Sequence, residues 1–174
     1  MSEKAQPQER VRTIADVAHA PLHIALVEPE IPPNTGNVAR LCAATGCALH
    51  LIEPLGFTID DRELKRAGLD YWHHLDVVTH PSLDAFLETT AHMRRWYLST
   101  RATRSYAQAD FARGDVLVFG RETKGLPADL IEREGERALR IPMRDESVRS
   151  INLSTAVGIV TYGALAAIGF PGLR

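Results

Sequence analysis

The sequence has few cysteines, no long apolar run and almost no net charge, and each absence excludes a class of protein. Only two of the 174 residues are cysteines. We expect Cys42 and Cys47 to be buried thiols on nearly opposite faces of one helix, where they form neither a disulfide nor a shared metal site. The formal net charge of −2 gives no overall field that would draw the protein to nucleic acid. An RNA site would therefore have to be a local patch.

Membrane and secretory signals are also absent. The most apolar segment, residues 156–170, is interrupted by Gly158, Gly163 and Gly169 and is shorter than the roughly 20 residues that a membrane span requires. Residues 1–20 mix acidic and basic side chains without a continuous apolar stretch, so we expect no secretory signal peptide. The sequence therefore predicts a cytoplasmic protein without a membrane segment.

The composition is that of a single soluble domain. Hydrophobic residues make up 45% of the chain and charged residues 24%, and there is no internal repeat or low-complexity tract. We expect residues 21–174 to form one domain and residues 1–20 to form a flexible or loosely docked N-terminal extension.

Short apolar runs alternate with helical patterns along the chain. A strand at residues 22–27 ends at a proline cluster, which starts a helix that stops at Gly46, before a strand at residues 48–52. Further strands are expected at residues 76–79, 95–100, 116–119 and 138–141, and helices near residues 61–68, 82–88, 126–134 and 153–168. This alternation predicts an α/β fold with a mostly parallel sheet and helices on both faces.

Three polar, glycine- or proline-containing segments each follow a predicted strand and precede a predicted helix. They are residues 34–40 (NTGNVAR), residues 119–125 (FGRETKG), and residues 141–143 (IPM) running on to residues 150–154 (SINLS). The carboxyl ends of parallel strands meet at one edge of the sheet, where open α/β folds bind their ligands. We therefore expect the three segments to form one site.

Each segment also has a simpler explanation. Residues 119–125 are no phosphate loop, because Lys124 precedes Gly125 and Leu126 and no hydroxyl follows to bind magnesium. They could form a turn that places Pro127 at the first position of a helix. Asn34 could be a helix cap, and so could Asn152 or Ser154, although capping does not account for the polar residues 144–150.

In the order in which they occur, these segments resemble the motifs of the SPOUT (trefoil-knotted) RNA methyltransferase superfamily, in particular the small tRNA 2′-O-methyltransferases that modify the wobble nucleotide. The resemblance runs from about residue 21 to residue 173. It implies a deep C-terminal trefoil knot and S-adenosyl-L-methionine bound in the knotted loops. It also implies a homodimer whose active site draws on both subunits, acting on the ribose 2′-hydroxyl of a cytidine or modified uridine in the tRNA anticodon loop.

The resemblance also assigns roles to individual residues. The cofactor-binding residues that it implies are Leu98, Gly120, Ile141 and Ser150. The catalytic residues that it implies are Asn34, Arg40, Glu122, Ser150 and Asn152. Arg149 and Tyr162 are weaker candidates for contact with the RNA. No metal is expected, because methyl transfer needs none.

The role of Arg40 is a separate hypothesis. A guanidinium with a pKa above about 12 is a poor proton acceptor. We therefore infer that Arg40 clamps a phosphate next to the target ribose and stabilises the developing alkoxide charge. Glu122 is expected to hold either Arg40 or the backbone of a loop.

Local RNA contacts have several candidates. The cations are Arg62, Lys65, Arg66, Arg101, Arg104, Arg144 and Arg149, and the possible stacking platforms are Tyr71, Trp72 and Tyr106. The histidines at positions 73, 74, 80 and 92 form no recognisable zinc set with the cysteines. Two alternatives stay open: 2′-O-methylation at another tRNA or rRNA ribose, and a non-catalytic RNA-binding module.

Overall fold

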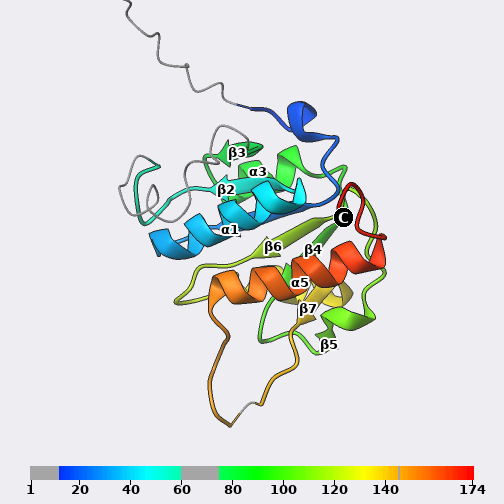
Figure 1. Cartoon of the computed structure of the whole chain (residues 1–174). Coiled ribbons are helices and arrows are strands. Elements are labelled where there is room, and N and C mark those ends of the chain that lie inside the picture. The colour runs from blue at the N-terminus through cyan, green and yellow to red at the C-terminus, as the bar shows by residue number, and fades with distance from the viewer. Residues whose placement is uncertain (1–11, 60–74, 145) are drawn as a thin grey trace, which may run out of the picture.

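The computed structural model describes residues 12–59, 75–144 and 146–174. Seven strands form one sheet in the order β3-β2-β1-β6-β4-β7-β5, and all the pairings described are parallel (Figure 1). The strands are β1 (His23–Val27), β2 (Ala48–Ile52), β3 (Val77–His80), β4 (Arg95–Leu98), β5 (Arg104–Ser105), β6 (Val116–Phe119) and β7 (Ala138–Arg140). The helices are α1 (Pro32–Thr45), α3 (Leu83–Thr89), α4 (Ala128–Glu134) and α5 (Leu153–Ala167), and the 3-10 turns are η1 (Ala15–Val17), η3 (Tyr106–Gln108) and η4 (Gly135–Arg137).

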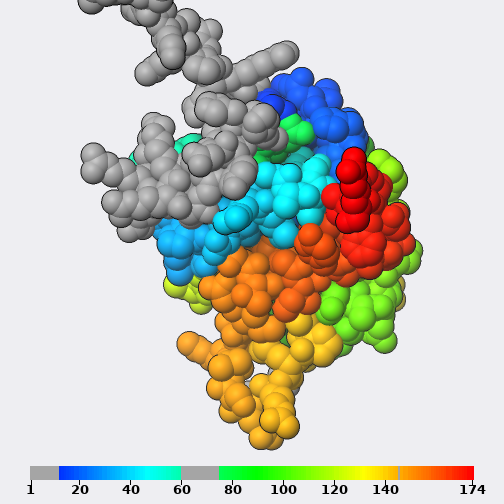
Figure 2. Space-filling view, in the orientation of Figure 1, coloured from blue at the N-terminus to red at the C-terminus, as the bar shows by residue number. Residues whose placement is uncertain are grey.

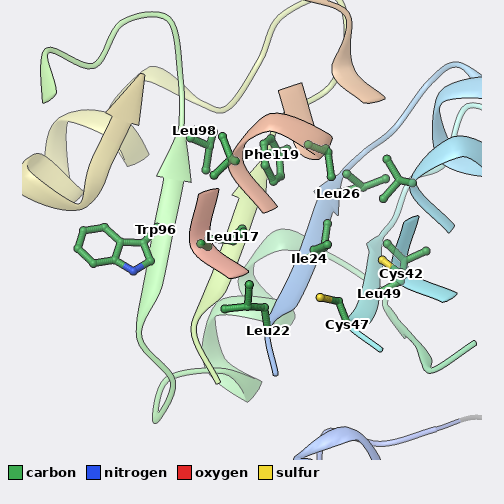
Figure 3. Packing of buried hydrophobic residues seen from close by; sticks show 14 of the residues in the cluster. Leu22, Ile24, Leu26, Cys42, Cys47, Leu49, Trp96, Leu98, Leu117 and Phe119 are labelled. Carbon is green, nitrogen blue, oxygen red and sulfur yellow. The ribbon is translucent and has the colours of Figure 1, made fainter. Parts of the chain in front are cut away.

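Helices cover both faces of the sheet, which confirms the predicted α/β arrangement. Successive side chains of a strand point to opposite faces, so Ile24 and Leu26 of β1 pack with α1 and α5, as Figure 3 shows for the strand side of this core. Ala25 and Val27 of the same strand belong to the other core, with α3 and α4. The central strands are therefore apolar on both faces, as expected for a buried parallel sheet.

The first strand-helix-strand unit follows from local sequence signals. Prolines fill the first two positions of α1, where their missing N–H costs nothing. The helix ends at Gly46, whose φ of 72° lies in the left-handed region that glycine tolerates. Cys47 follows this cap and lies just before β2, so the prediction that both cysteines share a helix was wrong. The prediction that both thiols are buried is confirmed.

Most predicted elements lie within one or two residues of the observed ones. The strand β5 was not predicted, because two residues are too short to show an alternating pattern. The predicted helix at residues 61–68 lies outside the described residues, as do residues 1–11 of the predicted N-terminal extension.

The described part of that extension contacts the sheet. Val17 is fully buried and packs with Ala20, Ala48 and Val78 in a small core of its own. Arg12 and His19 both pair with the carboxylate of Asp76. Residues 12–20 are thus held at the β2 and β3 side of the sheet.

Three buried histidines form a row across β1, β2 and β3. Nδ1 of His23 lies 2.9 Å from Nε2 of His50, and Nδ1 of His50 lies 3.0 Å from Nε2 of His80. Each contact needs one N–H donor and one free lone pair, so the row is satisfied by neutral imidazoles. Burial lowers the pKa of His23 from 6.5 to about 4, helped by the charges of His19 and His92, and lowers the pKa of His50 and His80 as well.

This row predicts acid sensitivity. Because the unfolded chain binds protons on these histidines from about pH 6.5 downward and the folded chain does not, the free energy of unfolding should fall as the pH is lowered. From the His23 shift alone we expect a loss of about 2 kcal/mol between pH 6.5 and 5. Urea unfolding at several pH values measures it. His23→Gln should flatten this dependence, and an equal slope in the variant would contradict a neutral row.

Candidate functional site

The strands β1, β6, β4 and β7 are neighbours in the sheet, and the segments that follow them meet at its carboxyl edge. They enclose a cavity of about 690 Å³, which is within the size range of ligand pockets. Its apolar lining includes Leu98, Phe119, Ile141 and Leu153. Its polar lining includes Asn34, Glu122, Ser150 and Asn152. The three polar segments of the sequence therefore do form one site.

Glu122 joins the segment after β6 to the segment after β1. Its carboxylate accepts hydrogen bonds from the backbone N–H of Glu30 at 2.8 Å and of Ile31 at 3.1 Å. It also accepts one from Nδ2 of Asn34 at 3.2 Å. Three donors on one half-buried carboxylate fix the start of α1 against the β6 loop. Of the two roles predicted for Glu122, the structure shows the contact with the loop backbone.

Asn34 and Asn152 extend this network to the third segment. Nδ2 of Asn152 donates to Oδ1 of Asn34 at 3.1 Å, and Oδ1 of Asn152 accepts from the hydroxyl of Ser154 at 2.8 Å. The same oxygen accepts the backbone N–H of Thr155, so Asn152 is the N-cap of α5 and also a site residue. Asn34 is no cap, because the N-cap of α1 is Ile31. The path from Glu122 through Asn34 to Asn152 links all three segments.

Two further contacts bind the same loops together. The Glu30 carboxylate accepts hydrogen bonds from the backbone N–H of Thr123 at 3.1 Å and from its hydroxyl. The Glu28 carboxylate pairs with the guanidinium of Arg121. Glu28 has a φ of 50°, which is unusual for a residue other than glycine and is held here by its neighbours. These contacts of Glu28 and Glu30 were not predicted, although two glutamates directly after a buried strand were a usable signal.

The loop after β6 is tightly closed around Gly120. A Cβ on Gly120 would lie 2.1 Å from the carbonyl carbon of Gly125 and 2.2 Å from the nitrogen of Leu126. Gly125 has a φ of 66° and donates its N–H to the carbonyl of Arg121 at 2.8 Å. Pro127 precedes the first residue of α4, so the predicted first-position proline is instead the N-cap.

The other predicted residues divide into two groups. Leu98, Gly120, Ile141 and Ser150 all line the cavity, and so does the exposed Arg149. Arg40 and Tyr162 do not line it. Arg40 is exposed on α1, and Tyr162 is 47% exposed on α5.

Several proposed RNA contacts fall elsewhere. Tyr106 packs its ring against Gly163 of α5, where a Cβ would lie 2.7 Å from the ring. Seven further residues named in the sequence analysis lie outside the described residues, namely Arg62, Lys65, Arg66, Tyr71, Trp72, His73 and His74.

Within the described ranges no group of three or more potential metal ligands occurs. The helices that the structure describes include none long and apolar enough to cross a membrane.

The carboxylate of Glu122 gives a testable prediction. Glu122→Gln keeps the shape of the side chain but replaces one of its two acceptor oxygens with an NH₂ group. Because an NH₂ group cannot accept a hydrogen bond, at least one of the three N–H donors that face the carboxylate loses its acceptor. We expect the turnover of the site to fall about 30-fold, with a loss of about 1–2 kcal/mol in the free energy of unfolding. Steady-state turnover measurements and urea unfolding of the same preparation measure both. Glu132→Gln, an exposed change on α4, is the control; full activity in Glu122→Gln would contradict a role of the carboxylate.

Known sequences and structures agree with this geometry. The sequence profile of the SpoU rRNA Methylase family matches residues 21–162. The chain is 52% identical over 153 residues to the tRNA (cytidine(34)-2'-O)-methyltransferase of Saccharophagus degradans, covering 87% of this chain and 99% of that protein.

Two solved structures are similar as well. The one described as "Structural insights into the 2-OH methylation of C/U34 on tRNA" is 48% identical, with a TM-score of 0.79, covering 84% of this chain and 95% of the other. An AdoMet-bound rRNA methyltransferase from Sinorhizobium meliloti shares the fold at a TM-score of 0.78 and 23% identity, covering 90% of this chain and 61% of that one.

Proposed function

Because this chain belongs to the SpoU rRNA Methylase family, we propose that it is a tRNA 2′-O-methyltransferase that methylates the ribose of the wobble nucleotide, a cytidine or uridine. The observation that carries the proposal is the single cavity into which the three polar segments converge, in a chain about half identical to wobble-nucleotide methyltransferases over most of its length. In the reaction the ribose 2′-oxygen forms a bond to a methyl carbon, the bond from that carbon to its donor breaks, and the hydroxyl loses its proton. The site must therefore hold the oxygen in line with the methyl donor.

We propose that the cavity holds S-adenosyl-L-methionine, which supplies a methyl group on a sulfonium. The residues present fit this molecule, because Leu98 and Ile141 offer apolar contact for a flat base. The loop that Gly120 closes lets backbone groups approach the base and the ribose. We propose that Ser150, an exposed residue of the cavity lining, contacts both the cofactor and the RNA.

The residues of the polar network act by positioning. Glu122 and Asn152 hold Asn34 from both sides, so the start of α1 is fixed relative to the cofactor loops. We assign to Arg40, further along the same helix, the clamping of a phosphate and the stabilisation of negative charge on the 2′-oxygen. The proton of the hydroxyl then leaves to phosphate or water, since a guanidinium does not accept it.

We further propose a homodimer. Arg40 does not line the cavity of its own chain. The helices α1 and α5 lie side by side on one face of the molecule (Figure 2), and Arg40 can serve the site of a partner if this face is the subunit interface. The exposed rings of Tyr162 and Phe170, 47% and 41% exposed, lie against each other at α5 and support an apolar contact there. We also propose that residues 21–174 form one catalytic domain with a C-terminal trefoil knot. We further propose that the protein is cytoplasmic, where tRNA is found.

The test is methyl transfer from labelled S-adenosyl-L-methionine into tRNA from cells that lack the protein. Nuclease digestion and mass spectrometry then locate the label. We expect one 2′-O-methyl group at the wobble nucleotide. Label at another ribose would overturn the substrate assignment but keep the reaction. Cofactor binding without any transfer would favour an RNA-binding module.

A further inference from the structure

A second hollow adjoins the cavity. It has a volume of about 320 Å³ and is lined by Val27, Glu28, Leu126 and Pro127, among others. Five of its lining residues also line the larger cavity, and three of these five are cationic: Arg101, Arg121 and Lys124. A molecule that extends out of the cavity in this direction would therefore pass three cationic side chains.

The charges in the second hollow do not balance. Its lining holds three cations and one carboxylate, and that carboxylate, on Glu28, is already paired with Arg121. Arg101 and Lys124 are exposed, and neither has an acidic partner in the part of the chain that the structure describes. Two positive charges are thus left over in a protein whose net charge is −2.

The loops that carry these two cations are well defined. Arg101 follows β4, where its backbone N–H donates to the hydroxyl of Ser99 at 3.1 Å. Lys124 sits in the β6 loop that the Gly125–Arg121 hydrogen bond closes and that Glu30 holds through Thr123. Both side chains therefore project from backbone that is fixed relative to the cofactor cavity.

We propose that Arg101 and Lys124 bind a phosphodiester of the RNA, namely the phosphate on the 3′ side of the methylated ribose. This inference rests on the proposed function. A ribose whose 2′-oxygen is at the reaction centre carries its 3′-phosphate on the neighbouring carbon, so that phosphate must lie close to the cavity. Guanidinium and ammonium groups are the side chains that bind phosphate oxygens best. Arg121 contributes less, because Glu28 neutralises it.

The first experiment separates RNA binding from cofactor binding. Arg101→Gln/Lys124→Gln should weaken tRNA binding about 10- to 30-fold near 0.1 M salt. It should also reduce the slope of log K against log salt by about 1, as loss of a phosphate contact does. Calorimetry with S-adenosylhomocysteine should give an affinity within about twofold of the wild type. A large loss of that affinity would overturn the proposal, because the cations would then bind the carboxylate of the cofactor.

The control is Arg113→Gln. Arg113 is exposed and precedes the amino end of β6, at the edge of the sheet opposite the site. Arg113→Gln removes one positive charge, half of what the double variant removes, at a residue that lines neither hollow. Its tRNA affinity and salt slope should therefore stay at the wild-type values. An equal loss in Arg113→Gln would mean that general charge attraction accounts for the effect and would overturn the specific site.

The second experiment identifies the phosphate. The modified tRNA carries one neutral methylphosphonate on the 3′ side of the wobble nucleotide. The wild-type protein should bind this tRNA about 10-fold more weakly than it binds normal tRNA. The double variant should bind the modified and the normal tRNA equally well. Additive effects, or coupling to the 5′ linkage instead, would overturn the assignment. Because both readouts are binding, they stand even if no methyl group is transferred, which distinguishes failure of this site from failure of the proposed reaction.

Discussion

Gly120→Ala is expected to lower the affinity for S-adenosylhomocysteine at least about 100-fold. The added Cβ would lie 2.1 Å from a backbone carbon and 2.2 Å from a backbone nitrogen of the same loop. Neither atom can move without opening the turn, so the loop must shift by about 1 Å or more. A displacement of about 1 Å costs about two orders of magnitude in rate where geometry is exacting, and we expect a similar loss of affinity for a ligand that the loop backbone contacts closely. Titration calorimetry measures the affinity directly.

The matched control is Gly158→Ala in α5. Its Cβ would meet no atom of the chain within 4 Å, and alanine favours a helix over glycine by about 1 kcal/mol. We expect this variant to bind the cofactor normally, because Gly158 does not line the cavity. Normal binding by Gly120→Ala would mean that the loop does not wall the cofactor site.

Arg40→Ala is expected to reduce methyl transfer about 100- to 1000-fold while cofactor binding is unchanged. The proposed guanidinium contact stabilises charge that develops on the 2′-oxygen, and loss of one such donor costs two to three orders of magnitude in other enzymes. The cofactor affinity should be spared, because Arg40 does not line the cavity of its own chain. Single-turnover kinetics at saturating tRNA measure the effect.

The pH profile distinguishes a clamp from a base. Arg40→Lys keeps the charge but not the planar fork, so the rate should drop uniformly at every pH. Disappearance of a titration step would instead make Arg40 the proton acceptor.

Mixing Arg40→Ala chains with Gly120→Ala chains tests the dimer, because a mixed dimer has one site with both residues intact. Absence of any regained activity in dimers of verified composition would contradict a shared site.

The sequence predicted the sheet and the convergence of the three segments because these depend on local signals. Apolar runs of four or five residues, a proline cluster before α1 and Gly46 after it are readable without any knowledge of packing. The edge at which the segments meet follows from parallel strands alone. The position of each cofactor residue along the wall was carried by the family resemblance.

The contacts inside the site could not be predicted in the same way. Asn34 has the residue type of a cap, and only its distance to Glu122 and Asn152 shows what it bonds. Glu28 takes a positive φ that its residue type disfavours, because tertiary contacts hold it there. The histidine row was missed for the same reason, since its members stand on three strands and meet only when the sheet is in register.

The distance along the chain between the partners of Asn34 has a consequence for synthesis. The side chain of Asn34 bonds to Glu122 and Asn152, which lie 88 and 118 positions further along the chain. These partners therefore leave the ribosome long after β1, α1 and β2. Contacts between residues so distant in the sequence form late in folding, because closing the long loop between them costs conformational entropy. A nascent chain can therefore pair its first strands while it still lacks any pocket for the methyl donor. S-adenosyl-L-methionine can therefore stabilise only chains whose synthesis is complete. Its cellular concentration should influence how long completed chains survive rather than how they begin to fold.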